Sequence, residues 1–109
     1  MKPDLSKPGS ENMNVSREID EHRNRIDKLD IEIARLLNHR AQCALEVGKL
    51  KESIGLDTYQ PNREVLVLEH ARKESGGPLD DGAITRLFER IIDESRRLEN
   101  TAEKKNAEE

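Results

Sequence analysis

Two basic residues, Arg40 and Lys51, lie on one face of a predicted helix, where a packed bundle would carry apolar side chains. Arg40 is four residues from both Leu36 and Ala44. Lys51 follows Arg40 by eleven residues, which is about three helical turns, so both cations project in nearly the same direction. If this helix face served only for packing, we would expect Leu or Ala at these positions.

Polar side chains also interrupt the apolar pattern near the C-terminus. Ser95 follows Ile91 by four residues, and Glu99 follows Ser95 by four, so both share the apolar face of a predicted C-terminal helix. If the helices pack along their apolar stripes, several cations converge on this region. They are Arg23, Arg40, Lys51 and Arg63.

Converging cations that face a core need anions to be stable. Glu64 and Glu99 cannot neutralise them all, so a ligand with more than one negative charge is the natural complement. Arginine suits carboxylates because its planar fork engages both oxygens. The alternative interpretation is that each long side chain lays its stem on the core and keeps its charge in water. That is the simpler explanation for any one residue, but the convergence of several favours a ligand site.

The sequence lacks motifs for covalent, metal or nucleotide chemistry. It has no nucleophile–base arrangement, no Gly-rich phosphate loop and no dinucleotide fingerprint. His39 and Cys43 are four residues apart, but no further ligand pair has helical spacing, so we expect no metal site. An enzyme with this sequence would depend on positioning and fixed charge.

The first element that must position these residues is a long helix. From Ile19 to Leu50, apolar residues recur at steps of three, four and seven, and no Pro interrupts residues 9–60. The period predicts a helix from the N-cap candidate Ser16 to about Lys51, roughly 54 Å long at about 1.5 Å per residue. The remaining chain is too short to cover such a helix, so a partner is implied, most simply a second copy.

Two further helices are predicted after the loop that follows the long helix. Pro61 suits the first position of a short helix because its missing N–H costs nothing there. Ser75 to Pro78 stop that helix, and Asp80 or Asp81 caps a third helix. The predicted fold class is therefore all-α, with three helices in the order long, short, long.

The same patterns predict the domain limits. We expect a helical domain over residues 15–100, a disordered N-terminal arm over residues 1–14 and a frayed charged tail over residues 101–109. The chain has no length for an added regulatory domain, so we expect a stand-alone, unregulated protein.

Composition narrows the function classes. The chain of 109 residues has one Phe, one Tyr and no Trp, so its core must be aliphatic and it offers few aromatic rings for stacking on nucleic-acid bases. Its net charge of −4 argues against a protein that neutralises phosphates. Cys43 is the only cysteine and no apolar run reaches membrane-spanning length. We therefore expect a cytoplasmic protein that binds neither nucleic acid nor membrane.

From about Arg17 to Glu99 the chain resembles the all-helical chorismate mutases. The matching spacings are Arg23-x-x-Ile26-x-x-Leu29-Asp30, Leu36-Leu37-x-x-Arg40, Val47-Gly48-Lys49-x-Lys51, Tyr59-x-Pro61-x-Arg63-Glu64 and Ile91-Ile92-x-x-Ser95. The resemblance implies an intertwined homodimeric bundle of three-helix subunits. It also implies conversion of chorismate to prephenate by a pericyclic rearrangement in aromatic amino-acid biosynthesis, without a cofactor.

The resemblance further implies a role for each basic residue. Arg40, with Arg23 supplied by the other subunit, would hold the two carboxylates of chorismate. Lys51 would reach the ether oxygen, where negative charge grows as the C–O bond breaks. Clamping the flexible side chain over the ring is an orientation effect, and a cation at the ether oxygen favours the transition state over the ground state.

The remaining implied roles concern the ring hydroxyl and the acid groups. Glu64 would take the ring hydroxyl, while Arg63 and Ser95 would help orient the carboxylates. Gln60 stands where many members have Asp, and it is a weaker candidate for the ring hydroxyl through its backbone and amide.

Glu99 departs from the pattern in which many members use Gln to donate a hydrogen bond to the ether oxygen. An ionised carboxylate has no proton to donate. Our hypothesis is that Glu99 works protonated, with its pKa raised by burial and opposed by the neighbouring Lys51.

Two alternative functions stay open at this stage. An isochorismate pyruvate lyase has the same fold, but the spacing Val47-Gly48-Lys49-x-Lys51 and Glu64 favour the mutase. A non-catalytic helical dimer that binds or regulates another protein would use the buried cations as pairing devices.

Overall fold

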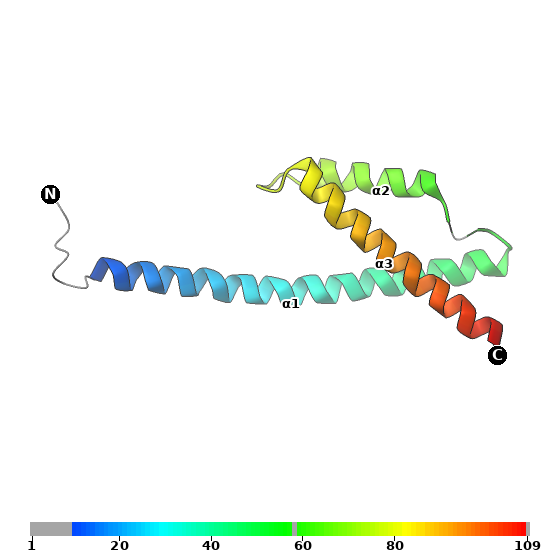
Figure 1. The fold of residues 1–109 in the computed structure, drawn as a ribbon, viewed down its shortest axis with the longest axis horizontal. Coiled ribbons are helices and arrows are strands. Elements are labelled where there is room, and N and C mark those ends of the chain that lie inside the picture. The colour runs from blue at the N-terminus through cyan, green and yellow to red at the C-terminus, as the bar shows by residue number, and fades with distance from the viewer. Residues whose placement is uncertain (1–9, 58, 109) are drawn as a thin grey trace. The chain divides into compact units, whose positions relative to one another are not determined.

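A computed structural model describes residues 10–57 and 59–108 of the protein. Over these residues it contains three α-helices and no strand: α1 (Ser10–Ser53), α2 (Pro61–Glu74) and α3 (Asp81–Glu108) (Figure 1). This confirms the predicted all-α class and the three helices. The chain divides into two compact units, Met1–Leu36 and Leu37–Glu109, which are described separately below.

In the first unit, α1 exposes every side chain that the structure describes, from Glu11 to Leu36. These include the predicted apolar stripe, in which Leu36 keeps 65% of its surface and Leu29 keeps 54%. A single helix cannot bury its own apolar face, so this stripe is uncovered within the unit.

The helix ends differ from the predicted ones. α1 begins at Ser10 rather than at Ser16, so residues 10–14 of the predicted arm are helical, while residues 1–9 lie outside the described part of the chain. Neither Pro nor Gly occurs between residue 9 and residue 16, and Glu11 in the first turn complements the helix dipole. α3 continues to Glu108, because the predicted tail consists largely of good helix formers.

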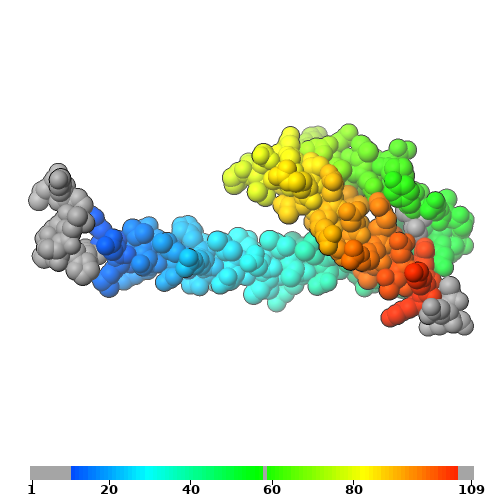
Figure 2. All heavy atoms as spheres, in the orientation of Figure 1, coloured from blue at the N-terminus to red at the C-terminus, as the bar shows by residue number. Residues whose placement is uncertain are grey.

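In the second unit, α2 and α3 pack against one another (Figures 1 and 2). Ile84 is the one buried hydrophobic residue of the described chain, and several apolar residues of α2 and α3, such as Val67, Leu68 and Phe88, are half-buried. Arg72 Nη1 on α2 donates to Thr85 Oγ1 on α3 at 3.0 Å. The core is thin and mainly aliphatic, as the composition predicts.

Caps and a tight turn fix how the helices of this unit begin and end. Pro61 opens α2, as predicted. Asp80 caps α3, since Ala83 N donates to Asp80 Oδ1 at 2.7 Å. After α1, Gly55 adopts the left-handed conformation with φ of 74°, and Leu56 N donates back to Lys51 O at 2.8 Å.

None of the helices in residues 10–57 and 59–108 has the length and apolar character that a membrane span requires.

Candidate active site

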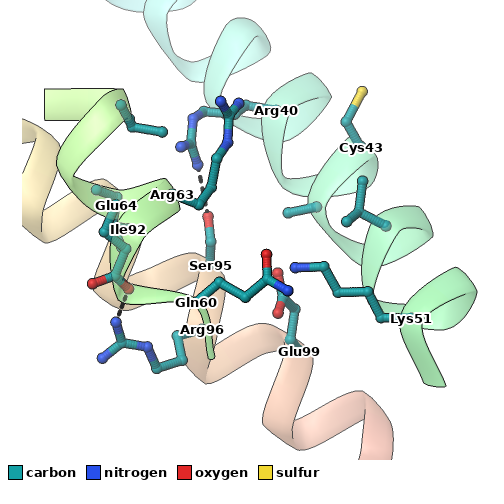
Figure 3. A pocket seen from close by; sticks show the side chains of 13 residues that line it. Arg40, Cys43, Lys51, Gln60, Arg63, Glu64, Ile92, Ser95, Arg96 and Glu99 are labelled. Atoms are coloured by element: carbon teal, nitrogen blue, oxygen red, sulfur yellow. Dashed lines mark hydrogen bonds and ion pairs between the residues drawn. The ribbon is translucent and has the colours of Figure 1, made fainter. Parts of the chain in front are cut away.

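All three helices contribute side chains to one pocket of the second unit, a cavity of about 280 Å³ (Figure 3). Its walls include the apolar residues Ala44, Val47, Val67 and Ile92. Seven of the eight residues that the sequence predicts for a site line this pocket. They are Arg40, Lys51, Gln60, Arg63, Glu64, Ser95 and Glu99.

The eighth predicted residue, Arg23, lies in the other unit. It belongs to α1, and its side chain is exposed there.

One end of the pocket is built from guanidinium groups. Figure 3 shows Arg40, from α1, and Arg63, from the first turn of α2, close to one another at this end. Arg40 Nη1 donates to Ser95 Oγ at 3.0 Å, which joins α1 to α3 across 55 residues of sequence. Because this bond uses only one of the nitrogens of Arg40, the guanidinium keeps other donors for a bound anion.

The other end of the pocket carries Lys51, Gln60 and Glu99, whose polar groups point toward one another in Figure 3. Gln60 is the N-cap residue of α2, but its side chain makes no capping hydrogen bond, so its amide is available to the pocket. Glu99 lies four residues after Ser95 on α3, which places both on the pocket face, as predicted.

Burial raises the pKa of Glu99 above its ordinary value of 4.5. The positive charge of Lys51 is the largest influence that lowers this pKa, and Arg96 and Arg40 lower it as well. Glu103 raises it further. The direction of the shift, and the opposition by Lys51, agree with the prediction. The protonated form of this carboxyl is therefore more accessible near neutral pH than for an ordinary glutamate.

Two polar pocket residues were missed by the sequence prediction: Arg96, and Cys43, which was considered only as a possible metal ligand. Arg96 forms an ion pair through Nη2 with Glu64 Oε1 (Figure 3). Its guanidinium carbon also lies 4.8 Å from the centroid of the Tyr59 ring. A signal for Arg96 was present, because it follows Ile92 by four residues and precedes Glu99 by three.

The charges around the pocket are unbalanced. Its lining holds four cations, Arg40, Lys51, Arg63 and Arg96, and two carboxyl groups, Glu64 and Glu99. Arg96 is paired with Glu64, so with Glu99 ionised the excess of +2 lies with Arg40, Lys51 and Arg63, and a small molecule with two negative charges is the matching ligand. Arginine forks, an ammonium group and a carboxyl that is readily protonated can hold and polarise such a molecule, but they provide no activated nucleophile.

Residues 22–100 match the sequence model of the chorismate mutase type II family. The chain belongs to this family. Chorismate mutase (form II) from Thermus thermophilus has a solved structure that is 36% identical to it, with a TM-score of 0.74 over 76% of this chain and 94% of that chain.

Curated relatives carry the chorismate mutase name within longer proteins. The bifunctional chorismate mutase/prephenate dehydratase of Neisseria gonorrhoeae is 44% identical over 89 residues, which is 78% of this chain and 24% of that protein. The protein of the same name from Pseudomonas aeruginosa is 38% identical over 80 residues, 69% of this chain and 22% of that protein. The chain thus spans about a quarter of the length of these curated relatives.

Proposed function

We propose that the chain is a chorismate mutase, which converts chorismate to prephenate in aromatic amino-acid biosynthesis. The observation that carries this proposal is the pocket with two guanidinium groups at one end and the side chains of Lys51 and Glu99 at the other. The reaction breaks one C–O bond and forms one C–C bond within the same molecule, so it needs no cofactor or co-reactant. The task of the protein is to hold the reactive conformer and to stabilise charge.

The two guanidinium groups are assigned to the carboxylates. Arg40, held by its bond to Ser95, would engage one carboxylate through its remaining nitrogens, and Arg63, which lies near Arg40 in Figure 3, would help orient the acid groups. Two carboxylates held at fixed positions bring the side chain of chorismate over its ring. This removes from the reaction step the entropy cost of folding the substrate.

The opposite end of the pocket is assigned to the breaking bond. Lys51 would donate to the ether oxygen and to a nearby carboxylate. Its positive charge at the ether oxygen favours the transition state, in which negative charge grows on that oxygen. Protonated Glu99 would donate a second hydrogen bond to the same oxygen, and the raised pKa of this carboxyl supports that role.

The ring hydroxyl is assigned to Glu64, with Gln60 as a second candidate. Both line the pocket, and a carboxylate is acceptor-only when ionised, which suits a hydroxyl donor.

We further infer that the protein acts as a homodimer in which each copy supplies Arg23 to the site of the other. The uncovered apolar stripe of α1 supports a partner helix, since a stripe of this length is unfavourable in water. The family resemblance supports the exchange of Arg23. Cytoplasmic location remains a prediction from the sequence.

The test is incubation of the purified protein with chorismate, following the loss of its ultraviolet absorbance and then identifying the product. We expect prephenate from the wild type and a loss of at least about a hundred-fold in kcat/KM for Arg40→Ala. Released pyruvate would instead assign the lyase reaction. No turnover by the dimeric protein would overturn the enzymatic proposal in favour of an interaction module.

A further inference from the structure

Arg96 joins three separate segments around one side of the pocket. Its side chain comes from α3, its ion-pair partner Glu64 comes from α2, and the Tyr59 ring beneath its guanidinium comes from the loop that precedes α2. The Arg96 and Glu64 side chains keep only 38% and 29% of their surface. The ion pair between Arg90 and Glu94, with 68% and 47%, is a far more exposed pair.

We propose that Arg96 is a positioning residue, which holds Glu64 in place to receive the ring hydroxyl of the substrate before the substrate binds. This inference rests on the proposed function, because it assigns Arg96 a part in the same reaction. The ion pair restricts a flexible glutamate to one conformation, and restriction in advance reduces the ordering cost of binding.

The geometry of the carboxylate leaves room for a substrate hydroxyl. Arg96 engages Oε1 of Glu64, and among the described residues no hydrogen bond to Oε2 is formed. A carboxylate can accept about four hydrogen bonds, so the ion pair and a hydroxyl do not compete for the same lone pairs. Arg96 therefore acts on the substrate through Glu64.

The contact with Tyr59 adds a second restraint. A guanidinium over an aromatic face is an attractive arrangement, and here it attaches the loop before α2 to α3. Gln60, which lines the pocket, is the next residue after Tyr59. Arg96 thus positions the two residues that are assigned to the ring hydroxyl, Glu64 directly and Gln60 through its neighbour.

The neighbouring Arg97 offers a matched control. Arg97 carries the same charge and lies on the same helix, but 71% of its side chain is exposed. Its ion-pair partner is Glu94, with Nη1 of Arg97 at 3.8 Å from Oε1 of Glu94. It does not belong to the pocket lining. A loss of charge on α3 by itself would therefore affect both variants equally.

The experiment measures kcat/KM for chorismate and for an analogue that lacks the ring hydroxyl. We expect Arg96→Ala to lower the value for chorismate by about ten-fold and to leave the value for the analogue near that of the wild type. Arg97→Ala should change neither value. Arg96→Lys, which keeps the charge without the fork, should recover part of the loss. In a Glu64→Ala background, Arg96→Ala should have no further effect on chorismate.

Other results would overturn the inference. An equal loss of kcat/KM on both substrates would show that Arg96 is a structural tether or contacts the carboxylates directly. Circular dichroism of Arg96→Ala and Arg96→Lys would show whether the loss is instead due to misfolding. Wild-type turnover with an unaffected Arg96→Ala would overturn this inference alone. An absence of turnover in the wild type would overturn the proposed function as well.

Discussion

A β-carbon added at Gly48 would lie 3.6 Å from the Cγ atom of Glu99, the carboxyl residue with the raised pKa. The backbone of Gly48 on α1 therefore lies beside the Glu99 side chain on α3. The nearest three Glu99 atoms would lie between 3.6 and 3.9 Å from that β-carbon, which is ordinary van der Waals contact. The position has space for a methyl group, but a longer side chain would have to displace the carboxyl.

This relationship predicts that Gly48→Ala is tolerated and stabilising. Alanine favours a helix interior over glycine by about 1 kcal/mol, and its methyl group covers Glu99 further, so the pKa of Glu99 should rise more. Thermal unfolding should show a higher midpoint, and the pH profile of activity should move to higher pH. Gly48→Leu is the contrasting variant, which should stay helical and lose activity. A lower unfolding midpoint for Gly48→Ala would contradict the geometry.

The raised pKa of Glu99 predicts that activity increases as the pH falls from neutral. The proposed donor must be protonated, and a raised pKa brings that protonation closer to neutral pH. Burial is the largest cause of the raised pKa and Glu103 adds to it, while Lys51, Arg96 and Arg40 oppose it. Glu99→Gln keeps a donor without a titration, so its kcat profile should be flatter than that of the wild type. A wild-type profile that is flat from mildly acidic to neutral pH would refute the role.

The same shift predicts a pH effect on stability. Between the ordinary pKa of 4.5 and the raised folded value, the folded state binds more protons than the unfolded state, so the free energy of unfolding falls as the pH rises through this window. The contribution of Glu99 is therefore fully present below pH 4.5 and lost above the folded pKa. Comparing urea denaturation of the wild type and Glu99→Gln across this range isolates the effect. If the difference in unfolding free energy between the wild type and Glu99→Gln were the same at every pH, this prediction would be contradicted.

The proposed exchange of Arg23 predicts complementation between two inactive variants. Arg23→Ala and Arg40→Ala homodimers should both be inactive. A mixed dimer would contain one complete site, in which Arg40 of one copy meets Arg23 of the other. After subunit exchange in equal amounts, half of the dimers are mixed, so activity should recover to about a quarter of the wild-type value. If Arg23 acts within its own chain, the mixture should remain inactive.

The N-cap of α3 predicts a stability difference between two adjacent aspartates. Asp80→Ala removes the acceptor for Ala83 N and should cost about 1 kcal/mol of unfolding free energy. Asp81→Ala removes only a favourable charge from the first turn, so its cost should be smaller. Chemical denaturation of both variants measures the difference, and the reverse order would contradict the assignment of the cap.

The local sequence pattern predicted the helices correctly but not all of their ends. The apolar period predicted three helices, and the N-terminal position of Pro61 was predicted correctly because proline has no N–H to lose there. The start of α1 was misplaced, since Ser16 has the chemistry of a cap but nothing in residues 10–15 stops a helix. Capping residues are signals for an end only where the chain beyond them disfavours the helix.

The sequence by itself determined which residues share a helix face, Arg40 with Lys51 on one helix and Ser95 with Glu99 on another, because helical geometry repeats regardless of what surrounds it. Only the tertiary structure decided which charged side chains form ion pairs with one another. Glu64 and Arg96 are 32 residues apart, and their pairing depends on the rotation and depth at which α2 packs on α3. Side-chain partners between helices follow from packing, which no local spacing specifies.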